Sequence, residues 1–434
     1  MNTTTTNQGA NRIVPIVMMI ALFGMISFVT NLAAPMGQVL KEQFGASNLQ
    51  GLLGNAANFI AYAVMGIPGG ILLQRIGYKK TSLVAIAVGF TGVLIQYFSG
   101  HAGQASAFGI YLLGAFVAGF SMCLLNIVVN PMLNTLGGGG NKGNQLIQVG
   151  GSFNSIMATF TPAFVGILIG ETAKANIKDV FPVMYIAMAV FAVVFVLMLI
   201  VSIPEPHIST SKEPLKNLMS GALQFRHFIL GAVAIFIYVG VEVGTPYIMM
   251  YWLSETATVG KTIAGFVAGT YWLLMMVGRM VGASIGSKVS SKSMLTFASA
   301  VGIIFILLAI FLPTSMEVSL PVIQRSAAGA LSFGLAQVPV NAMFMVLVGL
   351  CTSIMWGGIF NLAVEGLGKY LAAASGIFMV MVCGGGILPA IQGWVADMTG
   401  YLTSYWVIVA GFVYLLFYAL IGSKNVNTDI NTEE

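Results

Sequence analysis

Charged residues are scarce in this chain: they make up 7% of the 434 positions, against 58% that are hydrophobic. A soluble domain cannot cover its surface with so few charges, whereas helices that face lipid need none. Cys123, Cys351 and Cys383 all fall inside apolar stretches, so we expect neither a disulfide nor a metal site. The three histidines lack the spacing of a catalytic triad, and the glycine run at 137–140 lacks the Lys-Ser/Thr of a phosphate-binding loop. We therefore expect an integral membrane protein with no enzyme chemistry and no cofactor.

Long apolar runs are what the chain has in abundance. The first run is too long for a signal-peptide core and lacks a cleavage site, so we interpret it as a membrane helix. The runs lie at about 13–40, 51–73, 82–100, 105–133, 145–170, 180–203, 228–253, 262–287, 294–313, 340–367, 371–396 and 402–422. They predict an all-α membrane protein of twelve transmembrane helices in two six-helix halves. The expected division is a tail at 1–12, a first half at 13–203, a linker at 204–226, a second half at 227–422 and a tail at 423–434.

The segment 314–339 fits this scheme least well, because it is too apolar for an ordinary loop. Pro321, Arg325 and Pro339 interrupt it. We expect a re-entrant or interfacial piece, or an extended start to the tenth membrane helix. A thirteenth crossing here would place the C-terminus on the outside.

The positions of lysine and arginine predict the orientation. With both termini inside, 13 of the 18 basic residues, Arg279 among them, fall on the cytoplasmic side, and this asymmetry is typical of inner-membrane proteins. We therefore expect a multi-pass protein of a bacterial inner membrane with both termini in the cytoplasm. The net charge of +5 needs no nucleic-acid partner, because the basic residues concentrate in short loops.

One acidic residue stands apart from the other twelve, since Glu242 falls near the middle of an apolar run. A carboxylate at the bilayer centre costs on the order of 3 kcal/mol, so it is usually paired, protonated or in contact with water. Tyr238 and Thr245 share its helix face, and Pro246 can bend the helix just beyond it. Glu242 is either a functional contact in a polar cavity or a neutral structural acid bonded to a neighbouring helix. We expect no lysine or arginine at this depth, which disfavours an anionic substrate.

Amide side chains recur at helical spacing inside several runs, where a polar stripe facing lipid would be unfavourable. Amides both donate and accept hydrogen bonds, as sugar hydroxyls do, and aromatic rings can stack on a sugar ring. The alternatives are amides that hold helices together and aromatics that only pack. The candidate substrate-binding residues are Asn31, Asn55, Asn58, Asn126, Asn130, Gln148, Asn154, Tyr238, Glu242, Tyr271, Trp272, Trp356 and Asn361.

A short basic loop between the second and third runs carries the most specific motif. Gly70-Ile-Leu-Leu-Gln-Arg-Ile-Gly-Tyr-Lys-Lys80 resembles the signature loop of the major facilitator superfamily, with Gln74 in place of an aspartate. Within that superfamily the chain is similar to the fucose–glucose–galactose proton symporter family. The resemblance covers nearly the whole chain and is carried by FVTNLAAPMGQVL, CLLNIVVNPMLNTLG, YVGVEVGTPY and IMWGGIFNLAVEGLGKY. It implies cation-driven uptake of a monosaccharide by alternating access.

Two departures from the fucose branch refine this expectation. Ala34 and Asn126 stand where that branch has its acidic residues, whereas the glucose/galactose branch resembles this chain at Asn126 and Glu242. The resemblance therefore implies a proton-coupled importer of a neutral sugar, a hexose or a related mono- or disaccharide, with Glu242 as the coupling residue. We expect the chain to act as a monomer. The alternatives are a sodium-coupled or uncoupled sugar facilitator, an exporter of small metabolites or drugs, and a transporter-like sugar sensor.

Overall fold

The computed structural model describes residues 12–30, 48–169, 177–205, 215–256, 259–325 and 331–427, with 429, 430 and 432 beyond them. Within these residues, ten helical stretches are long and apolar enough to cross a membrane. One of them, Ala56–Ser99, turns at Gly77 (φ 86°) and supplies two crossings. The 30-residue helix α4 (Gly140–Ile169) is not among the ten, but it is long enough to cross a membrane and adds a further crossing. Counted in this way, the described part of the chain contains the twelve crossings that the sequence predicts.

The first group of helices comprises Arg12–Thr30, α2 (Asn48–Ser99), α3 (Gln104–Leu136), α4, the 3-10 turn η2 (Ile177–Val180) and α5 (Phe181–Ile200). The second group begins with α6 (Leu215–Ala222), α7 (Arg226–Glu255), α8 (Gly260–Ile285) and α9 (Ser291–Phe311). It continues with strands β1 (Glu317–Arg325) and β2 (Leu331–Pro339), and with α10 (Val340–Ser353) and α11 (Met355–Ala363). Its last members are η3 (Gly368–Tyr370), α12 (Leu371–Val380), η4 (Met381–Cys383), α13 (Gly384–Thr399), α14 (Tyr401–Ser404), α15 (Trp406–Phe417) and η5 (Tyr418–Gly422).

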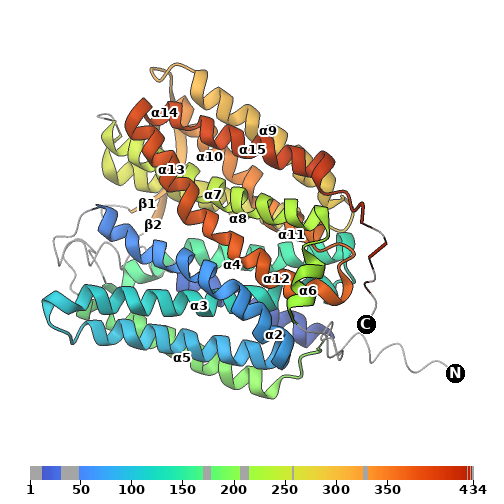
Figure 1. Cartoon of the computed structure of the whole chain (residues 1–434). Helices are drawn as coiled ribbons and strands as arrows, with labels where there is room; N and C mark the ends of the chain where they lie inside the picture. Colours follow the sequence, from blue (N-terminus) through green and yellow to red (C-terminus); the bar gives the residue numbers. More distant parts are fainter. Residues whose placement is uncertain are drawn as a thin grey trace.

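The two groups lie side by side and meet along a few helices. In Figure 1, α2, α3 and α5 occupy the lower part and α9, α10 and α15 the upper part, while α4 and α8 lie between them. We call one end of the bundle the linker end. It carries the turn at Gly77, the turn at Gly137–Gly140, the end of α5 and α6 itself, on the right in Figure 1.

Direct contact between the groups is tight at the linker end. A Cβ atom on Gly376 of α12 would lie 2.7 Å from the carbonyl oxygen of Gly66 and 2.8 Å from the Cα of Gly70, both on α2. Small residues allow membrane helices to approach this closely. On the other side of the bundle, Gln145 of α4 donates to the carbonyl oxygen of Ala283 of α8 (3.0 Å). The linker end is therefore closed by two separate helix pairs.

The basic loop of the signature motif is held by a carboxylate from a distant part of the chain. Gly77 adopts a positive φ, and a Cβ there would lie 2.7 Å from Glu205. The backbone N–H groups of Tyr78 and Lys79, at the start of the following helix, donate to the Glu205 carboxylate (2.6 and 3.1 Å). A negative charge at this position satisfies amides that have no partner within the helix. Gln74 stands where the signature loop has an aspartate, so in this chain the carboxylate that binds the loop comes from Glu205.

The expectation that the segment 314–339 extends the start of the tenth membrane helix is wrong, because β1 and β2 form an antiparallel hairpin. The alternative, a re-entrant or interfacial piece, stays a prediction. The register of the two strands pairs Pro321 with Leu335 and Glu317 with Pro339. Residues that alternate along the strands, such as Val322 and Val338, are buried, and Leu335 on the other face is 70% exposed. The hairpin packs on α8, where the Thr270 hydroxyl donates to the carbonyl oxygen of Pro321 (3.4 Å). Successive side chains of a strand point to opposite faces, so the residues of one face can be buried and apolar. This burial accounts for the apolar character of the segment.

Candidate functional site

Glu242 lies about midway along α7 and forms an ion pair. Its Oε1 is 3.4 Å from Nη2 of Arg279 on α8, and both side chains are largely buried. The expectation that no basic residue lies at this depth is therefore wrong, as is the placement of Arg279 among the cytoplasmic residues. Without Arg279, twelve basic residues remain on that side. Helix α8 runs on to Ile285, so Arg279 lies well inside it, and its long side chain reaches the middle of the bundle.

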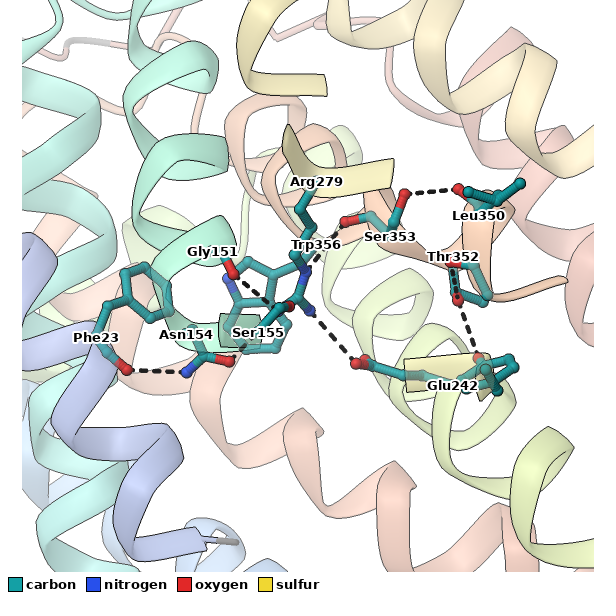
Figure 2. A network of polar contacts seen from close by, with 12 residues as sticks. Phe23, Gly151, Asn154, Ser155, Glu242, Arg279, Leu350, Thr352, Ser353 and Trp356 are labelled. Carbon is teal, nitrogen blue, oxygen red and sulfur yellow. Dashed lines mark hydrogen bonds and ion pairs between the residues drawn. The ribbon is translucent and has the colours of Figure 1, made fainter. Parts of the chain in front are cut away.

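Arg279 is also bonded to the other group of helices, as Figure 2 shows. Its Nη1 donates to three acceptors on α4: the carbonyl oxygen of Gly151 (3.2 Å), Oδ1 of Asn154 (3.3 Å) and Oγ of Ser155 (2.8 Å). Its Nε donates to the carbonyl oxygen of Ser353 at the end of α10 (3.3 Å). A buried guanidinium is stable only when it is paired and hydrogen-bonded, and here all three of its nitrogen atoms have acceptors.

A break in the tenth crossing provides part of this network. The sequence shows one apolar run at 340–367, but α10 ends at Ser353 and α11 begins at Met355. The last carbonyl groups of a helix lack intrahelical partners and are available to side chains. Ser353 accepts from Arg279, and the carbonyl oxygen of Ile354 accepts from Nε2 of Gln148 on α4 (2.8 Å). The break thus presents two backbone acceptors to the opposite group of helices.

A second polar chain crosses between the two groups beside the ion pair. Asn126 on α3 donates to the Tyr62 hydroxyl on α2 (2.7 Å), and Asn130 donates to Oδ1 of Asn126 (3.2 Å). Nε1 of Trp356 on α11 donates to Oδ1 of Asn130 (2.9 Å). The Trp356 ring lies 6.3 Å from that of Tyr238, one turn before Glu242 on α7. The fold therefore brings Asn126, Asn130, Trp356, Tyr238 and Glu242 into one region.

The remaining candidates have other surroundings. Asn361 accepts from Asn134 (2.8 Å) and donates to Ser291 (3.0 Å), so it joins three helices near the linker end. Asn154 donates to the carbonyl oxygen of Phe23 (2.9 Å), and the Tyr271 hydroxyl is bonded to Thr352 (2.9 Å). Trp272 is half-buried and perpendicular to the Tyr271 ring, and Asn58 is buried with no partner for its Oδ1 among the described residues. Asn31 and the side chain of Asn55 lie outside the described residues.

One face of α8 leads from the ion pair toward the opposite end of the bundle. Gly265, Gly269, Trp272 and Arg279 recur at helical spacing, so they lie on roughly the same side of the helix. A Cβ on Gly265 or Gly269 would have no other described atom within 4 Å. Among the described residues, none therefore covers this side of α8 beyond the ion pair, whereas toward the linker end the helix is closed against α4.

Comparison with known proteins places this architecture in a family. The sequence matches the Major Facilitator Superfamily over residues 16–388. The chain belongs to that superfamily. It is accordingly a multi-pass membrane transporter and not an enzyme, and the all-α fold class expected from the sequence is confirmed.

Individual members of the superfamily resemble the chain along nearly its whole length. It is 31% identical over 418 residues to the glucose/galactose transporter of Brucella abortus, covering 93% of both chains. It is 22% identical over 422 residues to the L-fucose-proton symporter of Escherichia coli, covering 91% of this chain and 89% of the symporter. Its fold matches a crystal structure of the superfamily transporter FucP in the outward conformation, with a TM-score of 0.79 at 18% identity, covering 96% and 100% of the two chains.

The residue that sequence reasoning missed is Arg279. A run of apolar residues does not show how far the helix continues past a charge, and the arginine lies near the end of the run at 262–287. A signal was nevertheless present, because Arg279 precedes Lys288, the next basic residue, by more than two helical turns.

Proposed function

We propose that this superfamily member imports a neutral sugar, a hexose such as glucose or galactose or a related mono- or disaccharide, together with a proton. The observation that carries the proposal is the ion pair of Glu242 and Arg279, which lies where the two groups of helices meet. The pair has no net charge, so the site suits an uncharged solute. The names of the similar glucose/galactose and L-fucose-proton transporters support the same substrate class and coupling ion.

The chemistry around the pair suits a polyhydroxylated ring. The amides of Asn126 and Asn130 can donate to and accept from hydroxyl groups. The rings of Tyr238 and Trp356 are tilted by 60° to each other and can contact the apolar faces of a sugar. In this proposal the sugar replaces some of the bonds that these side chains make to one another in the empty carrier.

We infer that the chain alternates between two states by relative movement of the halves 13–203 and 227–422, and that this structure corresponds to the outward-facing state. The support is the closed linker end together with the face of α8 toward the other end, which no described residue covers at Gly265 and Gly269. The asymmetry of basic residues favours a cytoplasmic linker end, cytoplasmic termini and a bacterial inner membrane, and we propose that the chain acts as a monomer. Labelling of a single cysteine at Ser209 by an impermeant reagent from outside would contradict this orientation.

Uptake into proteoliposomes tests the proposed substrate and coupling ion. A panel of labelled glucose, galactose, fucose, lactose and the anionic glucuronate is presented with a proton gradient, with a sodium gradient and with neither. We expect accumulation of a neutral hexose that requires the inward proton gradient and is lost when the gradient is dissipated. Accumulation driven by sodium, equilibration without accumulation, or selective uptake of glucuronate would each contradict part of the proposal.

Asn126→Ala should weaken sugar binding without a comparable loss of stability. The substitution removes an amide worth about 1–2 kcal/mol in hydrogen bonds, which corresponds to a roughly 5- to 30-fold rise in Kd. Sugar binding by calorimetry and thermal unfolding in detergent separate the two effects. The matched control is Asn341→Ala, because the buried Asn341 amide donates to the carbonyl oxygens of Ala309 and Leu312 at the end of α9 (both 2.8 Å). That variant should lose stability and keep its affinity. Unchanged affinity with lower stability in Asn126→Ala would show that Asn126 only holds helices together.

A further inference from the structure

We propose that Arg279 is a latch that holds the linker end closed, and that the negative charge of Glu242 keeps it engaged. The proposal rests on the alternating-access function argued above and assigns to Arg279 a positioning role in the conformational cycle. Arg279 belongs to the second group of helices, but one of its nitrogen atoms is bonded entirely to the first group.

The geometry divides the bonds of Arg279 between the two groups. Nη1 donates to Gly151, Asn154 and Ser155, all on α4, whereas Nη2 and Nε bind Glu242 and Ser353 on its own side. Separating α4 from α8 therefore breaks three hydrogen bonds at one side-chain nitrogen. The planar, rigid guanidinium can satisfy acceptors on both sides at the same time, which the single ammonium group of a lysine would do less well.

The charge of Glu242 determines whether the buried position of Arg279 is favourable. The acceptors on α4 and α10 are neutral, so Glu242 is the group in the network that offsets the positive charge. The other titratable side chains that face this carboxylate among the described residues are Tyr238 on α7 and Tyr271 on α8. These are phenols, which are ordinarily uncharged at pH 7. A buried cation whose partner is neutralised is strongly destabilised. Loss of the Glu242 charge therefore favours exposure of Arg279 to water, and parting of α4 from α8 provides that exposure.

Asn154 extends the latch to the first membrane helix. Its Oδ1 accepts from Arg279, while its Nδ2 donates to the carbonyl oxygen of Phe23 (2.9 Å). Release of Arg279 thus removes the donor from Oδ1 of Asn154, a residue that is also bonded to the helix Arg12–Thr30. The latch joins α8 to two helices of the first group, one directly and one through Asn154.

Distance measurements between spin labels test the latch directly. The labels are placed at Lys142→Cys, near the start of α4, and Lys288→Cys, just after α8, both exposed at the linker end. The background lacks the native Cys123, Cys351 and Cys383. Pulsed dipolar spectroscopy then reports the populations with the linker end closed and open. We expect Arg279→Gln and Glu242→Gln each to raise the open population several-fold, and the double variant to add little to Arg279→Gln. Arg226→Gln is the control, because Arg226 is exposed at the start of α7, and it should leave the populations unchanged.

An unchanged distance distribution in Arg279→Gln would overturn the proposal. If that variant does not fold, Ser155→Ala combined with Asn154→Ala removes two acceptors from α4 and should still raise the open population. No change in this double variant would overturn the latch equally. The measurement uses the carrier without sugar or ion gradient. If the Arg279→Gln distances shift but the wild-type carrier takes up no sugar, the latch is supported and the proposed substrate is contradicted. If the wild-type carrier takes up sugar but the Arg279→Gln distances do not shift, the proposed substrate is supported and the latch is contradicted.

Discussion

Glu242→Gln is expected to abolish accumulation of sugar against a gradient while leaving sugar exchange largely intact. Glutamine keeps the shape and hydrogen-bonding capacity of a protonated glutamic acid, but it cannot take up or release a proton. Steps that only carry sugar across the membrane should therefore continue, whereas the step that couples them to the proton gradient should be lost. The steady-state accumulation ratio should fall to about one, because a carrier without coupling can only equilibrate its substrate.

Two uptake assays in proteoliposomes distinguish this outcome from a general loss of activity. Gradient-driven uptake should disappear in Glu242→Gln, while exchange of labelled for unlabelled sugar at equal concentrations should persist. Glu255→Gln is the matched control on the same helix. Glu255 is the last residue of α7, where it accepts a hydrogen bond from the Tyr401 hydroxyl (2.6 Å) in an exposed position. That variant should accumulate sugar normally. Accumulation by Glu242→Gln with unchanged pH dependence would show that another group couples transport.

Gly376→Val should stop transport by preventing closure of the linker end. The Cβ of any other residue at this position would fall 2.7 Å from the Gly66 carbonyl oxygen and 2.8 Å from the Gly70 Cα. These are backbone atoms of a helix, which cannot rotate away as the end of a long side chain can. The two helices must then separate in the state described here, so we expect uptake to fall by at least about tenfold, which corresponds to a destabilisation of about 1.4 kcal/mol or more.

The distance between spin labels at Lys142 and Lys288 reports whether the linker end closes, and the rate of sugar uptake reports transport. Gly109→Ala is the control, because a Cβ on Gly109 of α3 meets no other described atom within 4 Å. It should transport normally with unchanged distances. Wild-type uptake by Gly376→Val would show that close approach of α2 and α12 is not needed in the cycle.

The sequence predicts those parts of the fold that depend on local pattern. An apolar run of about twenty residues is sufficient to predict a crossing, and amides at intervals of three and four residues predict a shared helix face. Asn126 and Asn130 do lie on one side of α3 and are bonded to each other. The family resemblance added the superfamily, which the comparison confirms.

Pairing between distant residues is what the sequence does not reveal. Glu205 binds backbone amides that lie 127 and 126 positions away, and no local pattern connects them. Arg279 and Glu242 were assigned to different environments, although they are separated by only 37 positions, since the depth of the arginine depends on where α8 ends. The hairpin depends on the same kind of distant pairing. Residues that alternate along its strands are buried against the bundle, and a search for apolar runs of helical length does not detect this alternation.

The cancelling charges of Glu242 and Arg279 have an electrical consequence for the transport cycle. If the unloaded carrier reorients with the pair intact, it moves no net charge through the membrane field, so the voltage neither drives nor opposes its return. A carrier with a proton on Glu242 moves one positive charge, and a potential of about 100 mV contributes about 2.3 kcal/mol per charge to that step. In a cell with a negative interior, the voltage would therefore act on the loaded, inward step and leave the empty, outward step unaffected.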